Sequence, residues 1–325
     1  MMRPLWKDLL VAVWIGMILP GIALNAFVWK ERHGQLQPVQ VQRSQSVSGN
    51  VRFVPVRDPD GTCISMELDS YLTGVLLAEM PASFHEEALQ AQAVAARTYA
   101  MKTCQDGKKH GGAICTSSEC CQGYMSTEAY LLRGWNQKYI LRVQNAVEQT
   151  RGQVLTYEGR LIRATYFSCS GGATESAVAV WGRDYPYLQS VKSPGEEETV
   201  YYTDTKAFST ESFQEALGIS LTGNPETWFG TITYTDGGGI DHMMIGGTEY
   251  RGTTLRALLG LRSTVFYVVV SDDGILFETK GFGHRVGMSQ YGADAMAQEG
   301  HDYRRILQHY YQGTEIFQLE APESP

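Results

Sequence analysis

The sequence predicts an α+β protein, in which an N-terminal transmembrane helix precedes a two-lobed body of mixed helices and antiparallel strands with a central cleft. Three observations support this fold class. The chain has an apolar run near its N-terminus, helical spacing of apolar residues early in the body, and short strand-like segments later. Strands and helices do not alternate in a repeating order, which argues against a doubly wound parallel sheet.

The apolar run covers residues 9–29 and is interrupted only by Pro20 and Asn25. Because about 20 apolar residues suffice to cross the hydrocarbon core, the run predicts a single-pass anchor. Arg3 and Lys7 precede it, and this charge placement favours an N-terminus in the cytoplasm and a body on the extracytoplasmic side.

A cleaved signal peptide is the alternative interpretation, with a loose small-residue site at Ala23–Ala26. In both cases the body is exported. The polar stretch after the run is typical of a linker, and the C-terminal residues are typical of a frayed tail. The predicted organisation is a cytoplasmic N-terminus (1–8), a transmembrane anchor (9–29), a linker (30–49), one folded domain (50–319) and a tail (320–325).

The composition allows a large core and gives no indication of nucleic-acid binding. Of the 325 residues, 43% are hydrophobic and 11% are aromatic, so the chain has enough apolar surface to bury. The formal net charge is −8, whereas a protein that binds phosphate backbones usually carries a basic surface.

The body begins with a predicted hairpin and two helices. Residues 50–66 contain two apolar-rich segments around the turn DPDG, which is typical of a hairpin. Residues 68–80 have apolar side chains at helical spacing, and Pro81 ends this helix. A second helix with an alanine-rich face is predicted to start near Phe84, because Ser83 and Glu86 have capping-box spacing.

The rest of the body changes from helices to strands. Residues 136–150 form a further predicted amphipathic helix. From Gln153 onward, segments such as QVLTYEG, LIRATYF, TVFYVVV and GILFETKG are typical of strands, and one short helix interrupts them. A last helix is predicted at 294–311.

Glu79 is the most informative residue of the early helices. It occupies the next position on the apolar stripe of the 68–80 helix. A carboxylate there loses hydration when it ionises, so its pKa should rise, which suits a general acid. The alternative is a glutamate turned to the surface at a frayed helix end. Arg97, beside the alanine-rich face, either extends to solvent or points to an anionic group near Glu79.

Four potential metal ligands lie in one twelve-residue loop, HGGAICTSSECC: His110, Cys115, Cys120 and Cys121. Thiolates and imidazole bind Zn²⁺, and four protein ligands would leave no open position, so the site would be structural. Disulfides are an alternative because the body is exported, and free thiols are another. Cys120 is also a candidate spectator, with Cys104 or water completing the site instead.

Three later segments carry candidate ligand-binding residues, each of which also has a plain structural interpretation. YFSCSGGATES clusters hydroxyls and backbone amides in a glycine-rich turn, which suits a sugar or an anion. VWGRDYPYLQSVKSP clusters aromatic rings, which stack on sugars but also fill cores. GFGHRVGMSQYGA gathers polar side chains on a tight backbone, as in a cleft wall.

These segments, together with LAEMPASFHEEALQAQAVAARTYA, resemble the stage II sporulation protein D family. The four motifs occur in order over nearly the whole body. The resemblance implies a lytic transglycosylase of the mother-cell membrane that faces the intermembrane space and acts during engulfment in endospore formation. Such an enzyme cleaves the MurNAc-β-1,4-GlcNAc bond of peptide-stripped strands and leaves a 1,6-anhydro end. The implied partners are peptidoglycan glycan strands, a cell-wall amidase and other engulfment membrane proteins.

The resemblance also assigns roles to residues. The family's catalytic glutamate corresponds to Glu79, and one carboxylate suffices because the C6 hydroxyl attacks internally, so the chemistry requires no cofactor. Some members carry zinc in the matching cysteine loop; here Cys120 replaces the usual histidine, and Cys169 replaces a common threonine. The expected substrate-binding residues are Arg97, Ser168, Ser170, Trp181, His284, Gln290 and Tyr291.

Two other functions are considered. Related proteins that activate amidases share the domain, so a wall-binding or amidase-enhancing module without catalysis is one. A thiol hydrolase that uses Cys169 with His284 is the other, although the thiol lacks a local activating pattern.

Overall fold

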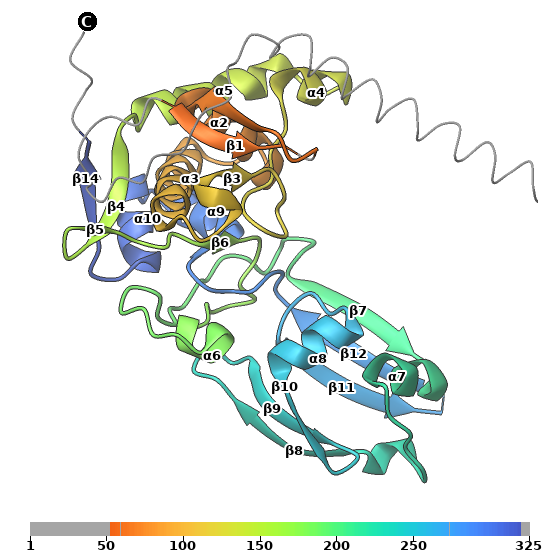
Figure 1. Cartoon of the computed structure of the whole chain (residues 1–325). Helices are drawn as coiled ribbons and strands as arrows, with labels where there is room; N and C mark the ends of the chain where they lie inside the picture. The colour runs from red at the N-terminus through yellow and green to blue at the C-terminus, as the bar shows by residue number, and fades with distance from the viewer. Residues whose placement is uncertain (1–52, 59, 273, 320–325) are drawn as a thin grey trace, which may run out of the picture.

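The computed structural model of the chain describes residues 53–58, 60–272 and 274–319, which form two lobes (Figure 1). Each lobe has its own hydrophobic core: one lies among the helices of the first lobe, and the other lies between the helices and sheets of the second. The prediction of a body of mixed helices and mostly antiparallel strands is confirmed for the described residues.

The fold-class prediction is wrong in its other part, the transmembrane helix. No helix among the described residues is both long enough and apolar enough to cross a membrane. The longest of them, α3 (Glu86–Asp106), has 21 residues but carries glutamate, glutamine, arginine and lysine along its length. Residues 9–29, to which the anchor was assigned, lie outside the described residues.

In the helical lobe, α3 is the central element. It packs against α2, α5, α9, α10 and β4. Its alanine-rich face is fully buried, and small side chains allow the neighbouring helices to approach closely. The helices of this lobe are α2 (Leu68–Glu79), α3, α4 (Thr127–Leu132), α5 (Gln137–Gln149), α9 (Gln290–Gln298) and α10 (Tyr303–Tyr310), with the 3-10 turn η1 (His110–Gly112).

Short sheets flank these helices. The predicted first hairpin is present as an antiparallel pair, and a third strand joins it in parallel. A second sheet is antiparallel, and a two-stranded parallel pair holds the glycine-rich motifs together. These sheets are β2 (Cys63–Glu67), β1 (Phe53–Arg57) and β3 (Ile114–Cys115); β14 (Glu315–Gln318), β4 (Gln153–Tyr157) and β5 (Arg160–Leu161); and β6 (Tyr166–Phe167) with β13 (Met288–Ser289).

The second lobe contains two antiparallel three-stranded sheets with two helices that pack against each other. The short helix α6 (Ala177–Trp181) lies between the lobes in Figure 1. The elements of the second lobe are β7 (Thr203–Phe208), α7 (Thr210–Leu217), η2 (Pro225–Thr227), β8 (Phe229–Tyr234), β9 (Ile240–Ile245), β10 (Thr248–Arg251), α8 (Gly252–Leu259), β11 (Val265–Ser271) and β12 (Gly274–Lys280).

Helix boundaries differ from the prediction at two places. The N-cap of α3 is His85, whose Nδ1 accepts the Glu87 N–H at 3.3 Å, so the predicted capping box that begins at Ser83 is not used. The predicted helix at 294–311 is two helices, α9 and α10, because the chain reverses at Gly300, which has a φ of 92°. A left-handed backbone at that position is readily adopted by glycine.

Candidate active site

The cavity that contains Glu79 has a volume of about 450 Å³. Its walls come from the end of α2, the loop between α3 and α4, the chain around β6, the end of α6 and the loop before β13. Segments far apart in sequence therefore meet around one carboxyl group. Of the predicted catalytic and substrate-binding residues, Glu79, Trp181 and His284 line the cavity together.

Glu79 is the last residue of α2, and it is half-buried. The helix ends there because Met80 is extended and Pro81 cannot continue the helical hydrogen bonding. Burial raises the pKa of Glu79 above its usual value, and a hydrogen bond from the backbone of Gly123 partly offsets this rise. The carboxyl group is thus held in a site that favours its protonated form, as a general acid requires.

Gly123 holds the Glu79 carboxyl group in place and was not identified from the sequence. Its N–H donates to Oε1 of Glu79. A Cβ at this position would lie 2.9 Å from that oxygen and 3.5 Å from the Cβ of Ala78. A side chain here would therefore push on the carboxyl group. The contact joins residues 44 positions apart, so no local pattern reveals it.

Gln122, next to Gly123, anchors this loop to three other elements. Its Oε1 accepts from the Tyr71 hydroxyl at 3.2 Å, and its Nε2 donates to the Tyr166 hydroxyl at 2.8 Å and to the Ala96 carbonyl at 3.3 Å. The side chain is buried, so these bonds are protected from competition by water. Gln122 therefore fixes the backbone that contacts Glu79.

Two tyrosines contribute neutral hydroxyl groups to the cavity wall. Burial raises the pKa of Tyr99 to about 12. Burial, together with the charge of Glu79, raises the pKa of Tyr166 well above its usual value. Because the Tyr166 oxygen accepts from Gln122, its own proton is free to be donated to another group.

His284 is neutral and structurally engaged. Burial, reinforced by the positive charge of Arg256, lowers the pKa of His284 to about 4. Its Nδ1 accepts the Val286 N–H at 3.1 Å. The ring centroid lies 5.3 Å from that of Trp181. His284 therefore supports Trp181 at the cavity wall and is a poor candidate for a general base at neutral pH, because its accepting nitrogen is occupied.

Arg97 does not line the cavity, and it is not exposed to solvent. Its Nη1 donates to the carbonyl of Thr150 at 2.8 Å, and its Nη2 donates to the carbonyl of Val147 at 3.1 Å. Asp69 lies 3.8 Å from the same guanidinium. Arg97 thus satisfies carbonyls at the C-terminal end of α5, which would otherwise lack donors. Neither placement considered from the sequence is found.

The remaining predicted substrate-binding residues also lie outside the cavity lining. The hydroxyl of Ser170 donates to the buried carboxylate of Glu196 at 2.6 Å. The carbonyl of Ser168 accepts the N–H of Tyr291, whose ring packs on Phe84 with 4.9 Å between centroids. Ser168 and Ser170 instead lie in the chain after β6, and Gln290 and Tyr291 lie in the first turn of α9. Their role in substrate binding stays a prediction.

Polar residues of the glycine-rich turns are donors to one buried carboxylate, that of Glu196. Its carboxylate accepts from the Ser170 and Gly171 backbones at 2.8 and 3.0 Å and from the Ser193 hydroxyl at 2.9 Å. Ser289 also donates to it. One buried acid thus ties together three motifs that carry predicted substrate-binding residues. The hydrogen bonds span up to 93 residues of sequence.

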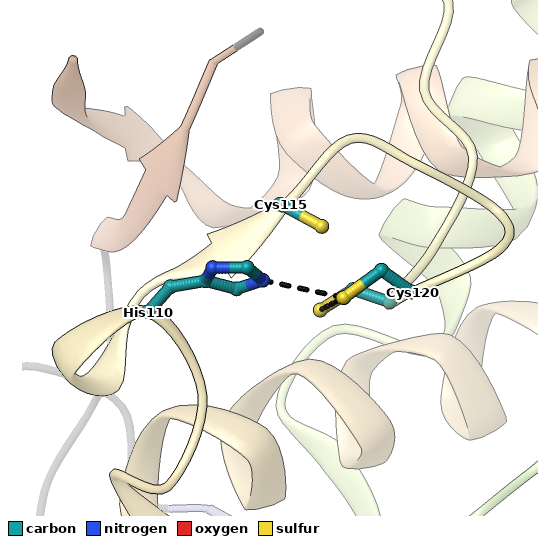
Figure 2. Close-up of side chains that lie close together, drawn as sticks. His110, Cys115 and Cys120 are labelled. Carbon is teal, nitrogen blue, oxygen red and sulfur yellow. Dashed lines mark hydrogen bonds between the residues drawn. The ribbon is translucent and has the colours of Figure 1, made fainter. Parts of the chain in front are cut away.

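The four predicted metal ligands come together. The potential donor atoms of His110, Cys115, Cys120 and Cys121 all lie within 4.8 Å of one another. Figure 2 shows the His110 ring and the thiols of Cys115 and Cys120 directed toward a common space. His110 adopts a backbone conformation with a φ of 48°, in the region that favours glycine.

Two of the distances between these donor atoms are close to those around a tetrahedral ion. With usual zinc–ligand bond lengths, ligand atoms around such an ion lie about 3.3–3.8 Å apart. His110 Nε2 is 3.3 Å from Cys120 Sγ, which is 3.9 Å from Cys121 Sγ. All six cysteines are free thiols in the structure, and this separation is too long for a disulfide bond. Cys120 and Cys121 also line the Glu79 cavity.

Comparison with known proteins identifies the family. The family model described as stage II sporulation protein matches residues 61–157, which include α2, α3, the four-ligand loop and α5. The stage II sporulation protein D of Bacillus amyloliquefaciens is 39% identical over 276 residues, which cover 82% of this chain and 79% of that protein. The Bacillus subtilis protein of the same name is also 39% identical, with 82% and 80% covered.

The chain belongs to the stage II sporulation protein D family. The resemblance predicted from its motifs is thus confirmed, and the family is one of sporulation proteins. The amidase enhancer of Bacillus subtilis is a more distant relative, with 31% identity over 307 residues, 75% of this chain and 40% of that protein. The family model covers the two features of the site with the clearest chemistry, Glu79 and the four-ligand loop.

Proposed function

We propose that this member of the stage II sporulation protein D family is a peptidoglycan lytic transglycosylase with Glu79 as its catalytic residue. The observation that carries the proposal is the position of Glu79: a carboxyl group at a helix end, in a cavity, with a pKa that burial raises. The cavity volume of about 450 Å³ is suited to a sugar ligand. The bond cleaved is the MurNAc-β-1,4-GlcNAc bond of peptide-stripped strands.

In the first step, the protonated Glu79 carboxyl group gives its proton to the glycosidic oxygen, and the bond between that oxygen and C1 of MurNAc breaks. In the second step, the Glu79 carboxylate accepts the proton of the C6 hydroxyl while O6 bonds to C1. The glycan then ends in a 1,6-anhydro ring, no water is consumed, and Glu79 returns to its protonated state.

The groups around Glu79 suit these two reaction steps. The Gly123 N–H stabilises the carboxylate formed after the first step, when Glu79 carries a negative charge. The neutral hydroxyls of Tyr99 and Tyr166 can donate to sugar oxygens, and Trp181 offers an aromatic face. A second acid, Glu119, also lines the cavity but is exposed on the loop. The proposed reaction does not require it.

We also propose a structural zinc ion on His110, Cys115, Cys120 and Cys121. Four protein ligands would fill a tetrahedral ion, so the metal would supply structural stability without contacting the substrate. The loop that carries these ligands continues directly into Gln122 and Gly123. The ligand residues would therefore fix the start of the segment that positions Glu79.

The proposed substrate places the working body on the extracytoplasmic side of the membrane, where peptidoglycan lies, during engulfment. An amidase that removes stem peptides would supply the substrate, and other engulfment membrane proteins would work on the same wall. The similarity to an amidase enhancer is consistent with a cell-wall role and raises a second candidate function. In that function, the chain binds the wall and stimulates an amidase without cutting glycan.

Product analysis separates these functions. The purified full chain is incubated with peptide-stripped glycan strands, and the ends are identified by mass spectrometry. We expect anhydro-MurNAc ends from wild type, their loss in Glu79→Gln, and near-normal formation in Glu119→Gln. Reducing MurNAc ends would instead indicate hydrolysis. Intact strands with binding retained would refute catalysis and favour the amidase-enhancing function.

A further inference from the structure

Three cationic side chains line the Glu79 cavity, but two of them are already engaged. Lys109 donates through Nζ to the carbonyl of Cys120. Arg163 forms an ion pair with Asp106, with 3.2 Å between Nη2 and Oδ2. The third cation, Arg183, is exposed at the cavity wall. Whether the Arg183 guanidinium has a partner within the protein decides whether the cavity offers a positive charge to a ligand.

Within the described part of the chain, no hydrogen bond or ion pair engages the Arg183 guanidinium. The adjacent acid, Asp184, accepts instead from Nε2 of Gln189, at 3.4 Å. Arg183 therefore presents an uncompensated positive charge and a planar set of donors to the cavity. Such a fork matches the geometry of a carboxylate.

Arg183 lies two residues after an aromatic side chain that also lines the cavity. Trp181 ends α6, and Gly182 turns the chain with a φ of 66°, so two neighbouring side chains both reach the cavity wall. The helix itself is held by Arg251, which donates to the carbonyl of Ala179 at 2.8 Å. The His284 ring packs against the Trp181 ring. An aromatic face and a free guanidinium that line one cavity suit a sugar that carries an acid.

We infer that Arg183 binds the lactyl carboxylate of a peptide-free MurNAc residue while Trp181 stacks on a sugar ring of the strand; this inference rests on the proposed function. In peptide-free strands each MurNAc carries this carboxylate, whereas an attached stem peptide converts it to an uncharged amide. Arg183 therefore favours stripped strands over peptide-bearing strands. The carboxylates of stem peptides are the other source of the same chemistry.

The test measures binding without cleavage, using the full chain with Glu79→Gln in every variant. Three ligands are compared: peptide-free strands, the same strands with their carboxyls converted to methylamides, and peptide-bearing strands. We expect the parent to bind the carboxylate form about tenfold more tightly than the methylamide form, which is about 1.4 kcal/mol. Arg183→Gln reduces this ratio to about one, and Arg183→Lys retains part of it.

Arg160→Gln is the matched control, because Arg160 is also an exposed arginine but lies in β5 and does not line the cavity. It should keep the tenfold ratio, and added salt should reduce the ratio in the parent. A ratio that survives Arg183→Gln, or a ratio of about one in the parent, overturns the inference. If Arg183→Gln weakens the binding of peptide-bearing strands alone, Arg183 binds the carboxylates of stem peptides and the lactyl assignment is wrong. If the ratio is found but wild type forms no anhydro ends, the proposed reaction fails and the carboxylate subsite stands.

Discussion

Gly123→Ala tests whether a single backbone contact sets the position of the catalytic acid. The added Cβ would lie 2.9 Å from Oε1 of Glu79, whereas ordinary contact begins near 3.4 Å, so the carboxyl group must shift by about half an ångström. Gly123 does not have a left-handed backbone, so alanine introduces no backbone strain there. Because a misplacement of about 1 Å can cost 100-fold in rate, we expect a loss of about tenfold in kcat.

The substitution should also change the pH profile in a defined direction. The Gly123 N–H lowers the pKa of Glu79 by stabilising the carboxylate, so weakening that bond raises the pKa further. A general acid must be protonated before it acts, and its rate falls as the pH rises through its pKa. The falling limb of kcat should therefore move to higher pH in Gly123→Ala.

The assay is the rate of anhydro-MurNAc formation from peptide-stripped strands over a range of pH. Gly230→Ala is the control, because its Cβ would lie 3.0 Å from the Cβ of Met244 in the second lobe, away from the cavity. It should retain the wild-type rate and profile. An unchanged rate and an unchanged falling limb in Gly123→Ala would show that this contact does not position the acid.

The remaining predictions concern the metal loop, the buried acid and the pH dependence of stability. Cys115→Ala should reduce bound zinc and lower the Tm, whereas Cys63→Ala, outside the ligand cluster, should change neither; equal metal content in all three proteins would contradict the site. Glu196→Gln should lower the free energy of unfolding in urea by about 3 kcal/mol, because an amide brings donors to a point where several donors already converge. The control Glu197→Gln, at an exposed position, should change this free energy little. Burial raises the pKa of Glu79, so the folded state holds this proton more tightly than the unfolded state, and stability falls as the pH rises through the folded pKa. Glu79→Gln should therefore be more stable than wild type at pH 8 but not at pH 4. The reverse order in thermal unfolding would be evidence against the buried acid.

The predicted residues that the structure brings into one cavity or one cluster are those whose signal is local. The stripe that ends at Glu79 is periodic over one helix, and burial of that stripe carries the carboxyl group to the edge of the core. The four metal ligands lie in one twelve-residue loop, so a few turns suffice to bring them together. In both cases, a short segment contains the chemistry and the geometry that it requires.

The predicted substrate-binding residues that do not line the cavity have partners far away in sequence. Ser170 has the appearance of a ligand-binding hydroxyl because its acceptor, Glu196, is 26 residues away and has no motif of its own. Arg97 has the appearance of an anion receptor because its true acceptors are backbone carbonyls more than 45 residues away. Sequence spacing shows that a polar group must be satisfied when it is buried, but it does not show which group satisfies it.

The same limitation explains why Gly123 was missed, and it shows how the site is organised. The loop after α3 begins with the metal ligands, reaches into the core through Gln122, and ends on the carboxyl group of Glu79 through Gly123. A half-buried acid needs burial to raise its pKa and one donor to stabilise the charge that it acquires after proton transfer. The helix supplies the first requirement and the loop supplies the second. Catalysis should therefore be sensitive to changes in the loop that leave α2 itself unaltered.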